Sequence, residues 1–108
     1  MHHALLDDRS LAFARAIAKR LREKPELMQV ARENLQRWMK RHAESPALLR
    51  CDREWAEILT SRSFDEIIGI LVQEDDKGKR LRQSHPFTDI LTPQEVSEMR
   101  REFAHAAR

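Results

Sequence analysis

The chain has 108 residues, a length typical of one domain, and 41% of its residues are hydrophobic, which is enough to form a folded core. A charged fraction of 35% excludes a membrane-embedded protein. Two glycines are too few for the glycine-rich phosphate loops of P-loop and dinucleotide-binding proteins, so both of these classes are excluded.

Scarce glycine, the absence of tyrosine and apolar residues at three-and-four spacing favour helices throughout. We therefore predict an all-α fold, a compact bundle of five to six short helices that forms one domain over residues 1–108. The first helix is expected over residues 8–22 or 10–22, and the second over residues 25–42. Because the link between them is short, they are expected to pack as an antiparallel hairpin.

The next two helices are predicted from their starts. Ser45 lies in the N-cap position before a proline, and this pattern predicts a third helix over residues 46–59. Ser63 and Glu66 have the spacing of a capping box, in which the two side chains bond each other's backbone N–H. The fourth helix that follows is rich in isoleucine and is expected to be the most central element.

The last third of the chain is predicted to hold two more helices. Asp75 or Asp76 is expected to cap a short basic helix, which ends before a proline-containing loop. Thr92 and Glu95 form a second capping box, and this box predicts a final helix over residues 93–105.

Charge is unevenly distributed along the chain. The net charge is +4 over residues 1–44, −5 over residues 45–76 and +3 over residues 77–108. The ordinary interpretation is a solvated surface of mixed charge. A functional interpretation is that the acidic middle resembles nucleic acid and binds a basic partner, with apolar loop residues as anchors. Phe87 could serve as such an anchor or pack in the core. The candidate partner-binding residues are Asp52, Glu57, Asp65, Glu74, Phe87 and Ile90.

Basic residues outside this middle segment suggest nucleic-acid binding as an alternative. The segment 77–82 has the composition of a recognition helix, but it is too short to lie in a major groove as helix-turn-helix motifs require. Binding to DNA through phosphate contacts stays open. The candidate nucleic-acid-binding residues are Arg15, Lys19, Arg22, Lys77, Lys79, Arg80 and Arg82.

One spacing resembles that of a catalytic motif. Arg37 and His42 match the Arg-x4-His pattern of helical HEPN ribonucleases. Two other Arg–His pairs in this arginine-rich chain have the same spacing, so the pattern arises readily by chance. We predict a protein without enzymatic activity, and a HEPN-like ribonuclease is the least favoured alternative. The simpler role of His42 is that of a cation at a helix C-terminus.

No metal or other cofactor is predicted. Glu102 and His105 form one Glu-x-x-His element, whereas helical di-metal sites require two such elements with further glutamates. Cys51 is the one cysteine and has no sequence signature of a nucleophile around it. A lone cysteine, together with the absence of an N-terminal apolar run of signal-peptide length, predicts a cytoplasmic protein with no membrane partner.

Several stretches of the chain resemble a group of small bacterial proteins that are the antitoxin half of toxin–antitoxin modules. The stretches are Ile17–Leu21, Ala31–Trp38, Glu54–Leu59, Arg80–Phe87 and Ile90–Glu95. The resemblance implies a non-catalytic protein that binds and neutralises a cognate toxin and that in some cases also binds its promoter DNA. It transfers no functional residues, and self-association stays open.

Overall fold

The computed structural model describes residues 2–106, and within them the chain is helical with no strand. The elements, in chain order, are α1 (His2–Glu23), the 3-10 turn η1 (Pro25–Leu27), α2 (Met28–Arg41), α3 (Pro46–Ser61), α4 (Phe64–Leu71), α5 (Asp76–Arg82) and α6 (Pro93–Ala106). The all-α prediction of five to six helices is confirmed. None of the helices described is long and apolar enough to cross a bilayer.

Both predicted capping boxes are present. The Ser63 hydroxyl accepts from the Glu66 N–H at 3.2 Å, and the Glu66 carboxylate accepts from the Ser63 N–H at 3.0 Å. Thr92 and Glu95 make the same reciprocal pair at 3.1 and 2.9 Å. Asp75, one of the two predicted caps of α5, accepts from the backbone N–H three residues later at 2.8 Å. These bonds satisfy N–H groups that a helix start leaves without an intrahelical partner.

Other helix ends differ from the predictions. α1 begins at His2, well before the expected start. Pro25 opens a 3-10 turn, and α2 begins after it at Met28. Ser45 occupies the predicted N-cap position of α3, with an extended backbone, but its side chain makes no capping hydrogen bond.

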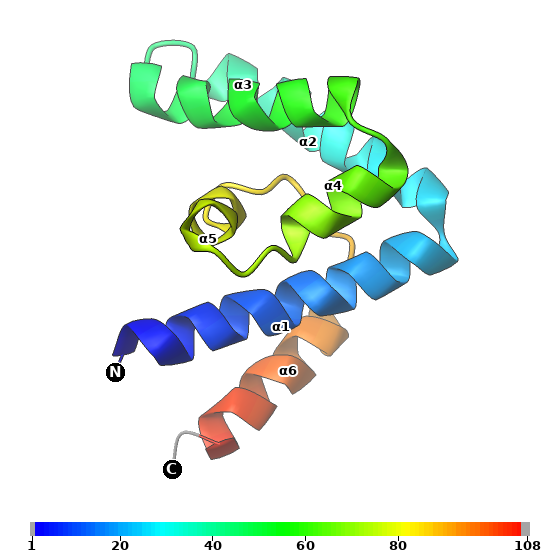
Figure 1. The fold of residues 1–108 in the computed structure, drawn as a ribbon, viewed down its shortest axis with the longest axis vertical. Coiled ribbons are helices and arrows are strands. Elements are labelled where there is room, and N and C mark those ends of the chain that lie inside the picture. Colours follow the sequence, from blue (N-terminus) through cyan, green and yellow to red (C-terminus); the bar gives the residue numbers. More distant parts are fainter. Residues whose placement is uncertain (1, 107–108) are drawn as a thin grey trace.

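The predicted hairpin of the first two helices is wrong. α1 and α2 diverge from the turn that joins them, and α2 packs instead along α3, with which it forms an antiparallel pair (Figure 1). α4, α5 and the connection over residues 83–92 fill the space between α1 and this α2–α3 hairpin. A link length therefore gives the direction of a neighbouring helix poorly when a third element can insert between the two.

The core is closed by the loop over residues 83–92. Trp55 and Phe87 are both buried and meet edge to face, with ring centroids 5.5 Å apart. The Trp55 indole N–H donates to the Leu81 carbonyl at 2.9 Å. The buried apolar residues are Ala14, Ile17, Ala18, Leu21, Met28, Ala31, Leu35, Trp55, Leu59, Ile67, Ile68, Leu71, Leu81, Phe87, Ile90 and Leu91.

One buried amide fastens this loop to α2. The Asn34 side-chain N–H₂ donates to the carbonyls of Pro86 and Thr88 at 2.9 and 3.1 Å. Its oxygen accepts from the Arg37 guanidinium. At the next residue, Asp89, the backbone has a φ of 71°, in the left-handed region that Asp tolerates better than bulkier residues. The loop is thus a fixed part of the core.

Arg82 is structural. It is 4% exposed, and its guanidinium donates to the carbonyls of Leu71 and Gln73, where α4 ends. A cation in this position satisfies carbonyl groups that the last turn of a helix leaves unpaired. Its assignment as a nucleic-acid contact is therefore corrected.

Candidate functional site

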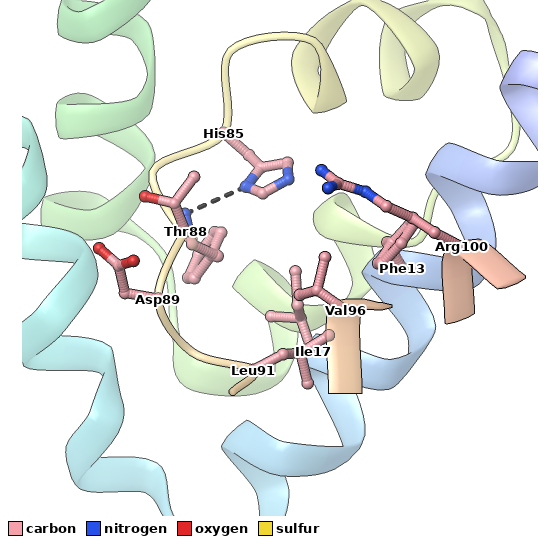
Figure 2. Close-up of a pocket in the computed structure, with 9 residues that line it drawn as sticks. Phe13, Ile17, His85, Thr88, Asp89, Leu91, Val96 and Arg100 are labelled. Carbon is pink, nitrogen blue, oxygen red and sulfur yellow. Dashed lines mark hydrogen bonds between the residues drawn. The ribbon is translucent and has the colours of Figure 1, made fainter. Parts of the chain in front are cut away.

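A cleft lies between α1, α6 and the loop over residues 83–92. Its volume is about 310 Å³, and its lining combines an apolar floor with a few polar groups at the rim (Figure 2). A second hollow continues from it along the loop and the first turns of α6. The residues that line the first cleft are Phe13, Ile17, His85, Phe87, Thr88, Asp89, Leu91, Val96 and Arg100.

His85 is the most unusual polar group in this cleft. Its Nδ1 accepts from the Phe87 backbone N–H at 3.0 Å, so a neutral ring carries its proton on Nε2. Burial, with a smaller effect of the nearby Arg82 guanidinium, lowers the pKa of His85 from 6.5 to about 4. The ring is therefore neutral at physiological pH and presents an Nε2–H donor.

Arg100 provides a positive charge at the same rim. Its guanidinium points toward the His85 ring (Figure 2). The apolar side chains of Phe13, Ile17 and Val96 lie below these two polar groups and line the cleft. Among the described residues Arg100 has no ion-pair partner. The Arg100 guanidinium, which has no carboxylate partner, and the neutral His85 N–H donor thus face each other across an apolar surface.

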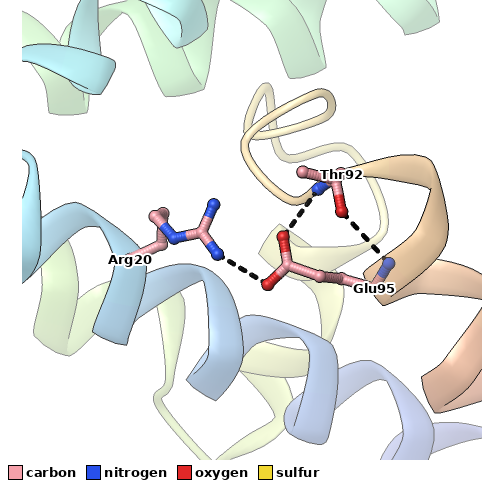
Figure 3. A network of polar contacts seen from close by, with 3 residues as sticks. All are labelled: Arg20, Thr92 and Glu95. Carbon is pink, nitrogen blue, oxygen red and sulfur yellow. Dashed lines mark hydrogen bonds and ion pairs between the residues drawn. The ribbon is translucent and has the colours of Figure 1, made fainter.

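α6, which forms one wall of the cleft, packs Val96 and Met99 against the core but has no residue that is itself buried. Arg20 on α1 pairs with Glu95 at 2.6 Å, and Glu95 also belongs to the capping box with Thr92 (Figure 3). The Thr92 N–H and the Arg20 guanidinium hold the pKa of Glu95 below its ordinary value. Farther along, the Phe103 and Phe13 rings lie 6.3 Å apart.

The predicted partner-binding residues do not form one surface. Asp52 is buried and lies 2.7 Å from the His42 ring, and Phe87 and Ile90 belong to the core, so these three assignments are corrected. The other three predicted residues are exposed: Glu57 on α3, Asp65 on α4 and Glu74 after α4.

The charged segments of the chain interleave in space. Arg22 pairs with Asp65 at 3.6 Å, and Arg15 pairs with Glu74 at 3.7 Å. In both pairs, an arginine predicted to contact nucleic acid neutralises a carboxylate predicted to contact a partner protein. Surface pairs of this kind add little stability, but they remove the single-sign patches that long-range attraction requires.

The remaining predicted nucleic-acid residues are dispersed as well. Arg80 forms a two-bond pair with Glu54 at 2.7 and 3.0 Å, and this pair lowers the pKa of Glu54. Lys19 is exposed on α1, Lys77 is exposed on α5, and Lys79 is half-buried there. α5 spans seven residues and turns Leu81 inward, so it is not a recognition helix.

The α2–α3 hairpin carries the largest group of unpaired cations. Six exposed Arg and Lys side chains on these two helices make no ion pair with any residue that the structure describes. Two acidic residues of the hairpin, Asp52 and Glu54, are paired with His42 and Arg80. The remaining acidic residues of the hairpin are three exposed glutamates. The six cations are Arg32, Arg37, Lys40, Arg41, Arg50 and Arg53.

Sequence reasoning missed part of this surface for an identifiable reason. Arg50 and Arg53 lie in the acidic segment 45–76, so a sum over the segment hides them. Their spacing of three residues places them on one helix face, and that spacing was the available signal.

The structure offers little for the chemical alternatives. His42 contacts Asp52 whereas Arg37 contacts Asn34, so the two residues of the HEPN-like spacing share no partner. Within the described part of the chain, no three His, Cys, Asp or Glu residues gather as a metal site would require. Cys51 is a half-buried free thiol.

Comparison with protein-family models, with curated proteins and with solved structures finds no match to this chain.

Proposed function

We propose that the protein is a non-enzymatic binding protein that contacts nucleic acid through its α2–α3 hairpin. The observation that carries this proposal is the unbalanced charge of the hairpin, which has six exposed unpaired cations and three exposed glutamates. Four arginines outside the hairpin, Arg15, Arg20, Arg22 and Arg80, are instead paired with carboxylates from other elements. A phosphate backbone is the polyanion that such a surface attracts most strongly.

The position of the hairpin suits this role. It lies at one end of the 41 Å long axis, and the connection between its two helices lies far from α6 and from the turn that joins α1 to α2 (Figure 1). Four of the six cations lie on the exposed sides of their helices, toward that connection: Lys40, Arg41, Arg50 and Arg53. A basic helix pair at one end of the molecule can contact a phosphate backbone through its exposed sides.

Two four-fold variants test this proposal by fluorescence anisotropy with a labelled DNA duplex. The first variant removes the cations near the connection: K40Q, R41Q, R50Q and R53Q. The matched control removes four cations of the body: R15Q, K19Q, R22Q and K77Q. Both variants lose the same net charge, so a difference in affinity reports the location of the charges and not their number.

The hairpin variant should bind at least tenfold more weakly than the control variant. The slope of log affinity against log salt should also become shallower, by about 0.9 for each phosphate that the variant no longer neutralises. Equal affinities of the two variants, or no binding by the unaltered protein at low salt, would contradict the proposal.

Neutralisation of a toxin is a second proposed function, and the cleft beside α6 favours it. A preformed hollow of about 310 Å³ with an apolar floor is able to receive an anchoring side chain of a partner protein. The residues that line the hollow come from α1, α6 and the loop over residues 83–92, and none comes from α2 or α3, so both surfaces are available at once.

Co-expression with the product of a neighbouring gene tests this second function. Cells that produce the toxin should survive with the unaltered protein, and the two proteins should co-purify. Equal survival with and without this chain would exclude the antitoxin role and leave the nucleic-acid proposal in place.

A further inference from the structure

We propose that the cleft between α1, α6 and the loop over residues 83–92 binds an apolar group that ends in a carboxylate. This inference gives the ligand chemistry of the surface invoked above for toxin binding, and in that respect it rests on the second proposed function. The same chemistry occurs in the C-terminal residue of a protein chain and in a free aromatic or aliphatic acid.

The rim of the cleft is suited to a carboxylate. The Arg100 guanidinium has no ion-pair partner among the described residues, and it points toward His85 (Figure 2). The His85 ring presents its Nε2–H because Nδ1 is occupied by the Phe87 N–H. Guanidinium and N–H donors that converge from two sides match the two oxygens of one carboxylate.

The floor of the cleft is suited to an apolar group of limited size. Phe13, Ile17, Leu91 and Val96 line it, from α1, the loop and α6. A volume of about 310 Å³ is at the small end of ligand pockets, which span roughly 300–1,000 Å³. One aromatic or branched side chain with its carboxylate therefore fits.

Asp89 limits the charge of the ligand. Its carboxylate lies at the same rim, but it points away from Arg100 and forms no ion pair with a described residue (Figure 2). A second negative group on the ligand would meet this carboxylate, so the cleft should prefer a monoanion. Asp89→Asn removes this repulsion and should tighten binding.

Two pairs of probes test the ligand chemistry on the full chain by NMR titration. The first pair is 3-phenylpropionate and its uncharged amide. The second pair is a Gly-Gly-Leu-Phe peptide with a free C-terminus and the same peptide with an amidated C-terminus. Binding of the free acid alone identifies a small molecule, and binding of the free peptide alone identifies a chain terminus. Each charged probe that binds should shift the His85 ring signals, whereas the amides should bind at least tenfold more weakly.

Arg100→Gln should weaken binding of the charged probe at least tenfold, whereas Arg101→Gln on the same helix should leave it unchanged. Both residues are exposed, so neither substitution disturbs the core. No shift of cleft residues with any probe, equal binding of acid and amide, or equal effects of the two substitutions would overturn the proposal. These outcomes do not depend on a toxin, so they are distinct from a failure of the co-expression test.

Discussion

Single polar residues hold the loop over residues 83–92 in the core. Asn34 is 1% exposed, and a buried amide is tolerated only when its hydrogen bonds are made. It donates to two loop carbonyls that have no access to a strand or helix partner. Sequence reasoning did not select this residue, because its partners are more than 50 positions away, at Pro86 and Thr88.

At the same scale, His85 gives the protein a specific sensitivity to acid. The unfolded chain binds a proton at this ring near pH 6.5, but the folded protein binds it only near pH 4. The unfolded state therefore holds more protons between these values, and stability should fall as the pH decreases from 6.5 and level off below 4. The expected loss is about 3 kcal/mol.

Urea unfolding at a series of pH values measures this loss. His85→Asn keeps an acceptor in the Nδ1 position for the Phe87 N–H but does not titrate, so its profile should be flatter between pH 6.5 and 4. Carboxylates with lowered pKa values, such as Glu66 and Asp75, contribute equally in both proteins and at lower pH. Coincident profiles would show that the ring does not determine the acid sensitivity.

At the scale of elements, the two glycines have opposite environments. A Cβ at Gly78 would lie 2.0 Å from the Gln73 backbone oxygen, whereas a Cβ at Gly69 would meet nothing within 4 Å. Gly78→Ala should therefore destabilise the protein by about 1–3 kcal/mol or more, because backbone must shift. Gly69→Ala should stabilise it by about 0.5–1 kcal/mol, because alanine favours the helix interior. Thermal unfolding of the two variants checks both signs, and a stable Gly78→Ala variant would contradict the close approach of α5 to Gln73.

The starts of the helices were predictable and their arrangement was not. A capping box is a contact between residues three apart, so Ser63 with Glu66 and Thr92 with Glu95 are visible in sequence alone. The separation of α1 from α2 accompanies the packing of Trp55 on α3 against Phe87, in the loop that lies between α1 and the α2–α3 hairpin. No local pattern encodes that contact.

At the scale of the whole molecule, the candidate site, like the arrangement of the helices, was not predictable from local sequence. Charge sums along the chain predicted an acidic middle and basic ends, but folding brings Asp65 beside Arg22 and Glu74 beside Arg15. The basic hairpin and the cleft both arise from residues that are distant in sequence or hidden in segment totals. His85 and Arg100 carried no ligand-binding signal in the sequence, because their shared cleft exists only once α6 lies against α1.

Also at this scale, α6 should be the first helix to open. It has no buried residue, and its contacts with α1 include one half-buried ion pair, Arg20 with Glu95. Arg20→Ala should raise the hydrogen-exchange rates of α6 amides and leave those of α3 unchanged, because local opening depends on local contacts. Arg22→Ala on the same helix removes an exposed pair with Asp65 and serves as the control. Equal exchange in α6 for both variants would argue against the role of the Arg20 contact.

The position of Phe87 also has a consequence for synthesis on the ribosome. The Trp55 indole N–H lacks the Leu81 carbonyl until α5 has been made, and the Trp55 ring lacks its edge-to-face neighbour Phe87 until the loop after α5 has been made. The first four helices can form as they emerge, since helix formation is local, but their common apolar interior stays open. A chain arrested near residue 75 is therefore a substrate for chaperones, and release of the last third converts it to the native state.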